Sequence, residues 1–236
     1  MLYVISDTHG YDFNKFLSLL DIAGFSDNDF LFILGDVIDR GEDGVKYLTW
    51  LLSCYNAQLI LGNHEEMLLA CVKLFDEITD ENIGNLNTDL MNNLAAWQIN
   101  GGETTINSLR KLKRYDNDMF NEIIDYLSNC PLWDTATAGG KDYLLTHSGI
   151  GNFKSDKKIS TYERHDFLWN RPNLSDRYFD DITTVFGHTP TEYYGDEYKG
   201  KILITDTWID IDTGAAMGNS PTILRLDDMK TFKINN

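Results

Sequence analysis

The chain has 236 residues, of which 42% are hydrophobic, and this is enough to bury a sizeable core in one domain over residues 1–236. No run approaches the ~18 consecutive apolar residues that cross a bilayer, and the start Met1-Leu2-Tyr3-Val4-Ile5 has no basic region or cleavage site. The net charge of -17 opposes binding to nucleic acid, because such binding uses Lys and Arg to neutralise phosphates. We expect a cytoplasmic protein with no nucleic-acid or membrane partner.

Three short apolar runs of buried-strand character lie in the first 75 residues, at Leu2–Ile5, Phe30–Leu34 and Gln58–Leu61. Each is followed by apolar residues at helical spacing. This alternation predicts βαβ units and a parallel sheet, whose strands end along one edge where ligands bind. Asp7 and Asp36 follow the first two strands and Asn63 follows the third, so we expect these side chains to converge.

The later part of the chain has a different pattern. Residues 76–130 are polar, with helical stretches around Leu90–Trp97 and Met119–Leu127, and predict a helical insertion that covers the site. From Asp142 onward the pattern favours strands and suggests a second sheet packed on the first. The predicted strands are Tyr143–Thr146, Thr183–Phe186, Ile202–Thr205, Trp208–Ile211 and Thr222–Leu226.

Four of the five histidines lie beside Asp, Asn, Gly or Ser at the ends of apolar runs. Their motifs are Asp7-Thr8-His9-Gly10, Gly62-Asn63-His64-Glu65, His147-Ser148-Gly149 and Gly187-His188-Thr189. A lone histidine at a strand end is usually a hydrogen-bonded core residue. Two such histidines beside glycine, with the carboxylates of the earlier motifs, favour the nitrogen and oxygen ligands of a two-metal site.

The most specific motif is the loop Gly35-Asp36-Val37-Ile38-Asp39-Arg40-Gly41. It brings two carboxylates and a guanidinium between two glycines, which let backbone and ligand approach closely. Asp36 can bridge two metals, and Arg40 can bind an anion. Asn63 offers a neutral oxygen or caps the next helix, and His64 is free to donate a proton.

The sequences around His165 and Arg171 lead to different predictions for these two residues. His165 lies in a charged stretch and is predicted to be on the surface. Arg171, between Trp169 and Pro172, is predicted to be positioned rather than mobile.

This ordered set of motifs resembles the PPP-type serine/threonine phosphatases, which belong to the calcineurin-like metallophosphoesterases. The resemblance extends from residue 7 to residue 189, and the runs Trp97–Thr105 and Ile211–Gly214 are similar to those of bacterial and phage members. It implies an α/β (α+β) fold, with a two-sheet sandwich flanked by helices in four layers, α/β/β/α.

The resemblance also implies a role for each matched residue. The residues that match ligands of the two metals are Asp7, His9, Asp36, Asn63, His147 and His188, with Asp36 shared. The residues that match groups acting on the phosphate are His64 as general acid, Asp39 as its orienting carboxylate, and Arg40 and Arg171 as phosphate-binding arginines. We expect two divalent cations, manganese first, with Fe, Zn and Mg as alternatives.

The implied reaction is hydrolysis of a phosphomonoester by a metal-bridging water, with a phosphorylated protein or a small phosphoester as substrate. Leu61 stands where the eukaryotic protein phosphatases usually have Arg, which argues against that branch.

Two other functions stay open. The symmetrical hydrolases of dinucleoside polyphosphates, such as diadenosine tetraphosphate, are similar through positions 7–65. However, they commonly lack the acid at Asp39 and often have Asp at Glu65, so the presence of both favours the monoesterase. A non-catalytic binding module is disfavoured because all six ligand positions are present. The sequence leaves the oligomeric state open.

Overall fold

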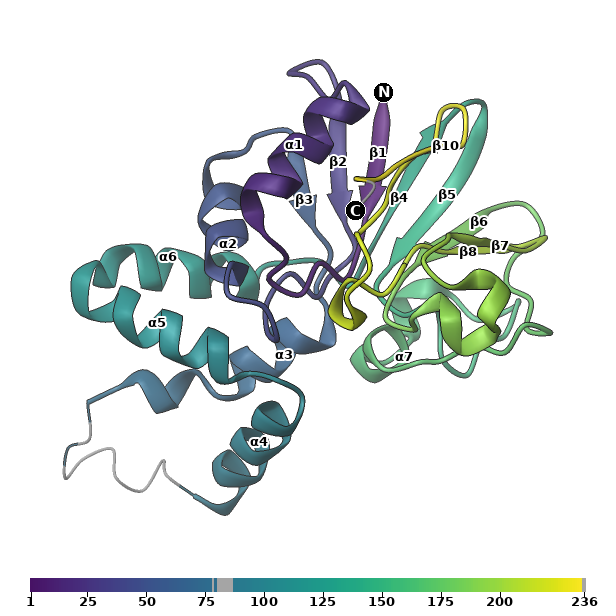
Figure 1. Cartoon of the computed structure of the whole chain (residues 1–236). Coiled ribbons are helices and arrows are strands. Elements are labelled where there is room, and N and C mark those ends of the chain that lie inside the picture. Colours follow the sequence, from purple (N-terminus) through teal and green to yellow (C-terminus); the bar gives the residue numbers. More distant parts are fainter. Residues whose placement is uncertain (78, 80–86, 235–236) are drawn as a thin grey trace.

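The protein has two mixed β-sheets flanked by helices (Figure 1). The computed structural model describes residues 1–77, 79 and 87–234. The strand order of the first sheet is β10 (Lys230–Phe232), β9 (Ile223–Arg225), β1 (Leu2–Ile5), β2 (Phe30–Ile33) and β3 (Ala57–Leu59). β1, β2 and β3 are parallel and are connected through α1 (Phe13–Ala23) and α2 (Gly44–Ser53). The predicted parallel βαβ units are therefore confirmed.

The second sheet has the strand order β4, β5, β6, β8 and β7, and it is also mixed. Its strands are β4 (Trp133–Ala138), β5 (Lys141–Thr146), β6 (Thr183–Phe186), β7 (Leu203–Ile204) and β8 (Trp208–Asp210). The parallel strands β5, β6 and β8 place their carboxyl ends on one side, as in the first sheet.

One sequence expectation about the sheets is wrong. The predicted strand at 222–226 is β9, which pairs antiparallel with β1 in the first sheet rather than joining the second. The free edge of β1 needs partners for its backbone N–H and C=O groups, and β9 supplies them. β4 and β10 were not predicted, because β4 is only partly buried and β10 is a short edge strand with two exposed residues.

Alternate residues along the inner strands enter different layers of the core. Tyr3 and Ile5 of β1 pack among the helices, whereas Val4 packs against the second sheet. In β5, Tyr143 faces the first sheet and Leu144 faces the outer side of the second. Strands buried on both faces read as continuous apolar runs. The result is the predicted four-layer arrangement of the α+β class.

Helices of the predicted insertion lie beside the first sheet. They are α4 (Thr88–Ile99), α5 (Glu103–Tyr115) and α6 (Asn117–Ser128), which follow α3 (Asn63–Ala70) and the short η1 (Val72–Phe75). Their buried residues, such as Trp97, Leu109 and Ile123, belong to the same cluster as the apolar faces of α1 and α2. Residues 78 and 80–86 of the predicted insertion lie outside the described residues.

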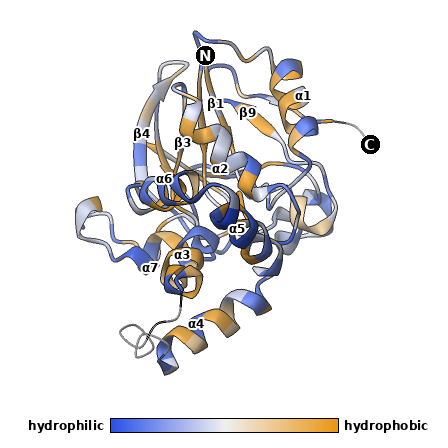
Figure 2. Ribbon diagram, turned by 90° about the vertical axis from the view of Figure 1, so that its left-hand side faces the viewer, coloured by the Kyte–Doolittle hydropathy of each residue, from blue (hydrophilic) through white to orange (hydrophobic). Residues whose placement is uncertain are grey.

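Short helical elements cover the outer side of the second sheet. They are η3 (Ile159–Thr161), α7 (Arg164–Leu168), η4 (Thr191–Tyr194) and η5 (Asp196–Tyr198). A further short element, η6 (Ala215–Met217), lies between β8 and β9 along the chain. Helix α5 is largely hydrophilic in Figure 2, in agreement with the charged and polar residues of its sequence. Among the described residues, none of the helices combines the length and apolarity that a membrane span requires.

Candidate metal centre

The predicted site residues occupy tight turns that follow the strands. Eight non-glycine residues in the described part of the chain have a positive φ, a conformation that costs on the order of 1–3 kcal/mol each and persists where the surroundings impose it. Six of them are predicted site residues: Asp7 (50°), His9 (44°), Asp36 (57°), Asp39 (71°), Arg40 (66°) and His188 (70°). The backbone strain is therefore concentrated at the site.

Backbone hydrogen bonds join the turns after β1 and β2. The N–H of Asp7 donates to Gly35 O at 3.1 Å, and the N–H of His9 donates to Asp36 O at 2.8 Å. Glycine is required where another turn approaches, because a Cβ on Gly62 would collide with Asp36.

Glu65 is a supporting residue to which the sequence pattern gave no role of its own. Its buried carboxylate accepts hydrogen bonds from the backbone N–H groups of Asp36 (2.8 Å), Val37 (2.9 Å) and Gly62 (3.0 Å). Charged acceptors of this kind form strong hydrogen bonds. Glu65 therefore holds the Asp36 loop against the start of α3.

Asp36 lies between two groups of possible metal ligands. Its Oδ2 is 3.6 Å from His9 Nε2, and its Oδ1 is 3.5 Å from His147 Nε2. Ligand atoms within 4.8 Å of one another form one group of His9, Asp36 and His64, and another of Asp36, His147 and His188. Asp36 belongs to both groups, which is the geometry that its predicted bridging role requires.

The two remaining predicted ligands adjoin these groups. Asp7 Oδ1 is 3.9 Å from His9 Nε2, and Asn63 Oδ1 is 2.8 Å from His147 Nε2. All six residues are buried. The structure thus gathers the whole predicted ligand set, from five strand ends, at one edge of the sandwich.

Backbone carbonyls fix the tautomers of two histidines. His9 Nδ1 donates to Ile38 O at 3.1 Å, and His147 Nδ1 donates to Leu34 O at 2.7 Å, because a carbonyl can only accept. Burial lowers the pKa of His147 to about 3, so its ring is neutral at pH 7. In both rings the lone pair of Nε2 then faces Asp36, as in a metal-binding histidine whose other nitrogen is held.

The buried carboxylates of the cluster favour the binding of cations. Burial raises the pKa of Asp7 and of Asp36 well above the usual value, and repulsion adds to this, from Asp212 on Asp7 and from Asp7 on Asp36. Burial also lowers the pKa of His9 and of His188. Asp7 Oδ1 and His188 Nε2 are buried without a hydrogen-bond partner. A pair of divalent cations fits these donors, because it would neutralise the carboxylates and coordinate the unpaired atoms.

His64 and Asp39 form a second feature of the site. His64 Nδ1 is 2.6 Å from Asp39 Oδ2, and the backbone N–H of His64 donates to Asp36 Oδ1 at 3.0 Å. Arg40 lies over this pair, with Nη1 3.1 Å from His9 Nε2 and Nη2 3.4 Å from His64 Nε2. The predicted acid, its carboxylate and one predicted arginine are therefore adjacent.

Arg171 reaches the same place from the segment between α7 and β6. Its Nη1 donates to His188 O at 3.1 Å and to Thr189 Oγ1 at 3.2 Å. Arg171 and Arg40 both line a cavity of about 90 Å³ over the ligand cluster. His165 is exposed, as predicted from its charged surroundings. The two arginines supply local positive charge in a chain whose net charge is -17.

Sequence reasoning missed two residues of the site. Trp97 is fully buried and donates its Nε1–H to Asp39 Oδ2 at 2.8 Å. Asp212 is buried and lines the cavity, and burial raises its pKa to about 6. Both lie in the runs that resemble bacterial and phage relatives, but the sequence pattern alone does not show that they contact the site.

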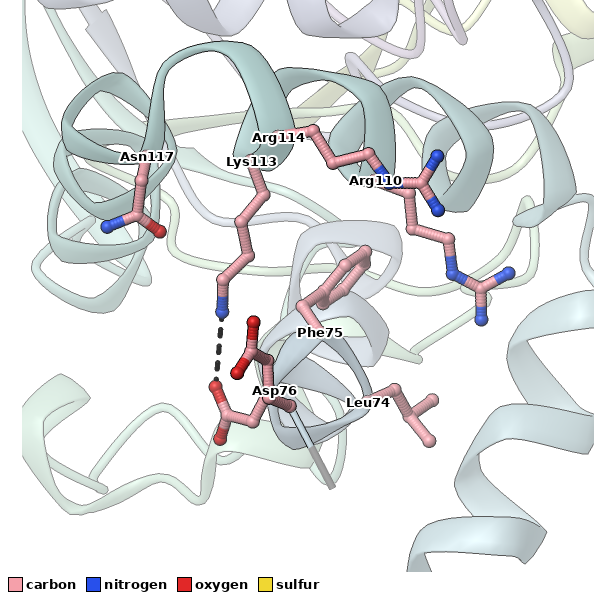
Figure 3. Close-up of a pocket in the computed structure, with 8 residues that line it drawn as sticks. Leu74, Phe75, Asp76, Arg110, Lys113, Arg114 and Asn117 are labelled. Atoms are coloured by element: carbon pink, nitrogen blue, oxygen red, sulfur yellow. Dashed lines mark hydrogen bonds and ion pairs between the residues drawn. The ribbon is translucent and has the colours of Figure 1, made fainter. Parts of the chain in front are cut away.

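A larger cavity of about 540 Å³ lies between η1 and α5 (Figure 3). Lys113 Nζ is 3.2 Å from Asp76 Oδ1 across it, and Arg110 and Arg114 extend from the same helix. None of the described residues that line it is a histidine. The larger cavity therefore does not share the ligand chemistry of the smaller one.

Comparison with known proteins identifies the family. The model of the calcineurin-like phosphoesterase family matches residues 1–211. This chain belongs to that family. It is a metallophosphoesterase, an enzyme that hydrolyses phosphoesters, and the family depends on two metal ions. The predicted superfamily is confirmed.

Two of the similar curated proteins are named as bis(5'-nucleosyl)-tetraphosphatases. The asymmetrical bis(5'-nucleosyl)-tetraphosphatase PrpE of Geobacillus thermodenitrificans is 24% identical over 257 residues, 98% of this chain and 92% of the relative. The symmetrical bis(5'-nucleosyl)-tetraphosphatase of Buchnera aphidicola subsp. Schizaphis graminum is 33% identical over 178 residues, 72% of this chain and 59% of the relative.

A solved structure shares the fold. The crystal structure of "a putative diadenosine tetraphosphatase" covers 99% of this chain and 92% of its own, with a TM-score of 0.65 and 17% identity. The comparisons give no specific support to the narrower prediction of a serine/threonine protein phosphatase, and they do not identify manganese as the metal.

Replacement of Asp36 by asparagine removes the charge of the side chain but keeps an oxygen that accepts a hydrogen bond. Because the pKa of Asp36 in the folded state lies above 3.8, the folded protein binds more protons than the unfolded one, and this carboxyl costs stability as the pH rises above that value. The amide of the variant cannot ionise, but its oxygen still accepts from the N–H of His64. In chelator at neutral pH, Asp36→Asn should therefore melt at a higher temperature than wild type, and the gap should close as the pH falls towards about 4.

Added Mn²⁺ supplies the second half of this test. It should raise the melting temperature of the wild type, since binding to the folded state stabilises it, and should leave Asp36→Asn unchanged. A variant that melts below wild type in chelator, or that keeps the metal-dependent rise, would contradict the central position of this carboxylate.

Proposed function

We propose that this protein hydrolyses dinucleoside polyphosphates of the diadenosine tetraphosphate type and cleaves them asymmetrically. The proposal rests on how much of each relative's length aligns with this chain. Relatives named as asymmetrical tetraphosphatases match 98–99% of this chain and 92–94% of their own length, whereas the first symmetrical relatives are covered over 59–63% of theirs. The Asp39–His64 pair agrees with this choice, since symmetrical hydrolases commonly lack the acid at that position.

The ligand cluster provides the site for the reaction. Two divalent cations would be held by Asp7, His9 and Asp36 on one side and by Asp36, Asn63, His147 and His188 on the other. When bound, these ions polarise the reacting phosphoryl group and lower the pKa of the attacking water. Arg40 and Arg171, which line the cavity, bind the phosphoryl oxygens and offset the charge that develops on them.

His64 serves as the general acid for the leaving oxygen. Asp39 accepts from Nδ1–H at 2.6 Å, which orients the ring and directs Nε2 away from Asp39. Because His64 lines the cavity, a proton on Nε2 is placed to pass to the leaving group.

A phosphomonoesterase that acts on phosphoproteins is the second candidate. The observation that favours it is the joint presence of Asp39 and Glu65, both engaged in short hydrogen bonds around the site. These two functions differ in what lies beyond the reacting phosphate, so a panel of substrates distinguishes them.

The first test compares products from diadenosine tetraphosphate with turnover of a phosphoserine peptide, using Mn²⁺-loaded protein. We expect equal amounts of ATP and AMP, resolved by ion-exchange chromatography, and a much lower kcat/KM for the peptide. Two molecules of ADP would replace the asymmetrical assignment with a symmetrical one. Turnover of the peptide alone would overturn the proposal, and Asp36→Asn controls for a contaminating hydrolase.

The second test concerns His64. The substitution His64→Asn should lower turnover of diadenosine tetraphosphate by roughly 10²–10⁴-fold, the usual contribution of a general acid. The metal content, measured by elemental analysis, should stay at that of wild type. If the variant instead loses metal, His64 is a ligand and the acid must be sought elsewhere.

A further inference from the structure

Helix α4, the turn that follows it and the first turn of α5 contact the loop Gly35–Gly41 at three points. Trp97, which is 0% exposed, donates its Nε1–H to the same Asp39 oxygen that binds His64. The backbone N–H of Asp39 donates to Thr105 Oγ1 at 2.9 Å, and the N–H of Arg40 donates to Gly101 O at 3.0 Å. Asp39 is thus held through both its side chain and its backbone by residues of 97–105.

We propose that Trp97 is a positioning residue for the Asp39–His64 pair, an inference that rests on the proposed role of His64. A carboxylate that only one partner holds can rotate about its last bond. Here the indole N–H at 2.8 Å and the imidazole N–H at 2.6 Å fix one oxygen from two directions, and the other oxygen is buried without a partner. The indole therefore sets the orientation of Asp39, and through it the direction of His64.

The substitution Trp97→Phe tests this proposal, because it keeps a buried aromatic ring and removes the N–H. The readout is the dependence on the leaving group, since a good leaving group such as p-nitrophenolate needs little acid catalysis and phenolate needs more. We expect kcat for phenyl phosphate to fall about tenfold or more and kcat for p-nitrophenyl phosphate to fall less than about threefold. KM and metal content should stay unchanged.

The substitution Trp208→Phe is the matched control. Trp208 is also 0% exposed and donates its Nε1–H at 2.9 Å, but to Asp176 O in the outer layer of the second sheet. It should lower the melting temperature without changing the ratio of the two rates. His64→Asn must show the leaving-group dependence if His64 is the acid. If it does and Trp97→Phe lowers both rates equally or neither, the role of Trp97 is refuted, whereas absence of the dependence in His64→Asn refutes the acid assignment itself.

A second, independent observation concerns the size of the cavity. At about 90 Å³ it is well below the roughly 300–1,000 Å³ of sites that enclose a drug-sized ligand. It has room for the reacting phosphate, and the remainder of a larger substrate must therefore lie over its rim. Tyr193 in η4 and Met217 in η6 border the cavity and are 65% and 45% exposed.

We infer that Tyr193 and Met217 form a contact surface for a nucleobase of the substrate, which deepens the proposed function and rests on it. Bases stack on aromatic side chains, and a thioether makes favourable contacts with aromatic rings. Two large apolar side chains left exposed beside a polar, charged cavity suit a ligand that joins a phosphate to an aromatic ring.

The substitution Tyr193→Ala tests the inference, with Tyr115→Ala as the control, because Tyr115 is 89% exposed at the end of α5 and does not line the cavity. KM for diadenosine tetraphosphate should rise roughly 5- to 100-fold, as expected for loss of one stacked base. The inhibition constant of inorganic phosphate should stay within about twofold, and the control should match wild type.

An unchanged KM, or an equal loss for inorganic phosphate, would refute the base contact. If wild-type protein does not turn over diadenosine tetraphosphate at all, the proposed function fails first, and the two failures are distinguishable in the same assay.

Discussion

The arrangement of the site depends on one buried carboxylate that lies between neutral imidazole rings. Asp36 has Oδ2 towards His9 and Oδ1 towards His147, and its pKa is raised by burial and by Asp7. Such a group is costly unless a cation or a proton compensates it. The protein nevertheless holds it in place through its backbone N–H, which donates to the carboxylate of Glu65. A buried carboxylate that is held in place although its burial is costly is typical of a metal-binding site.

The sandwich supplies the rigidity that this cluster requires. Parallel strands in both sheets end on one side, and turns after strands of each sheet have a positive φ at predicted site residues. Hydrogen bonds between the turns, such as that from His9 to Asp36 O, replace the regular pairing that the strands lose there. Strain of this kind is stable only where the flanking core is well packed, and the layers on both sides of each sheet provide that packing.

Much of the site could be predicted because its residues follow strands in a repeating pattern. Parallel strand ends share an edge, so Asp7, Asp36 and Asn63 had to converge. The partner of β9 could not be predicted, because β9 pairs with the free backbone groups of β1, which lie far away in the sequence. The role of Trp97 could not either, since its bond to Asp39 joins positions 58 residues apart and neither residue type signals it. The comparisons, not the motif pattern, moved the preferred substrate from a phosphoprotein to a dinucleoside polyphosphate.

The bridging position of Asp36 is tested most directly by anomalous diffraction from crystals grown with Mn²⁺. We expect two anomalous peaks roughly 3.5–4 Å apart, the usual separation in two-metal sites, with Asp36 contacting both. The first should adjoin Asp7 and His9, and the second Asn63, His147 and His188. A single peak, or a pair of peaks that Asp36 does not join, would show that Asp36 does not bridge two metal ions.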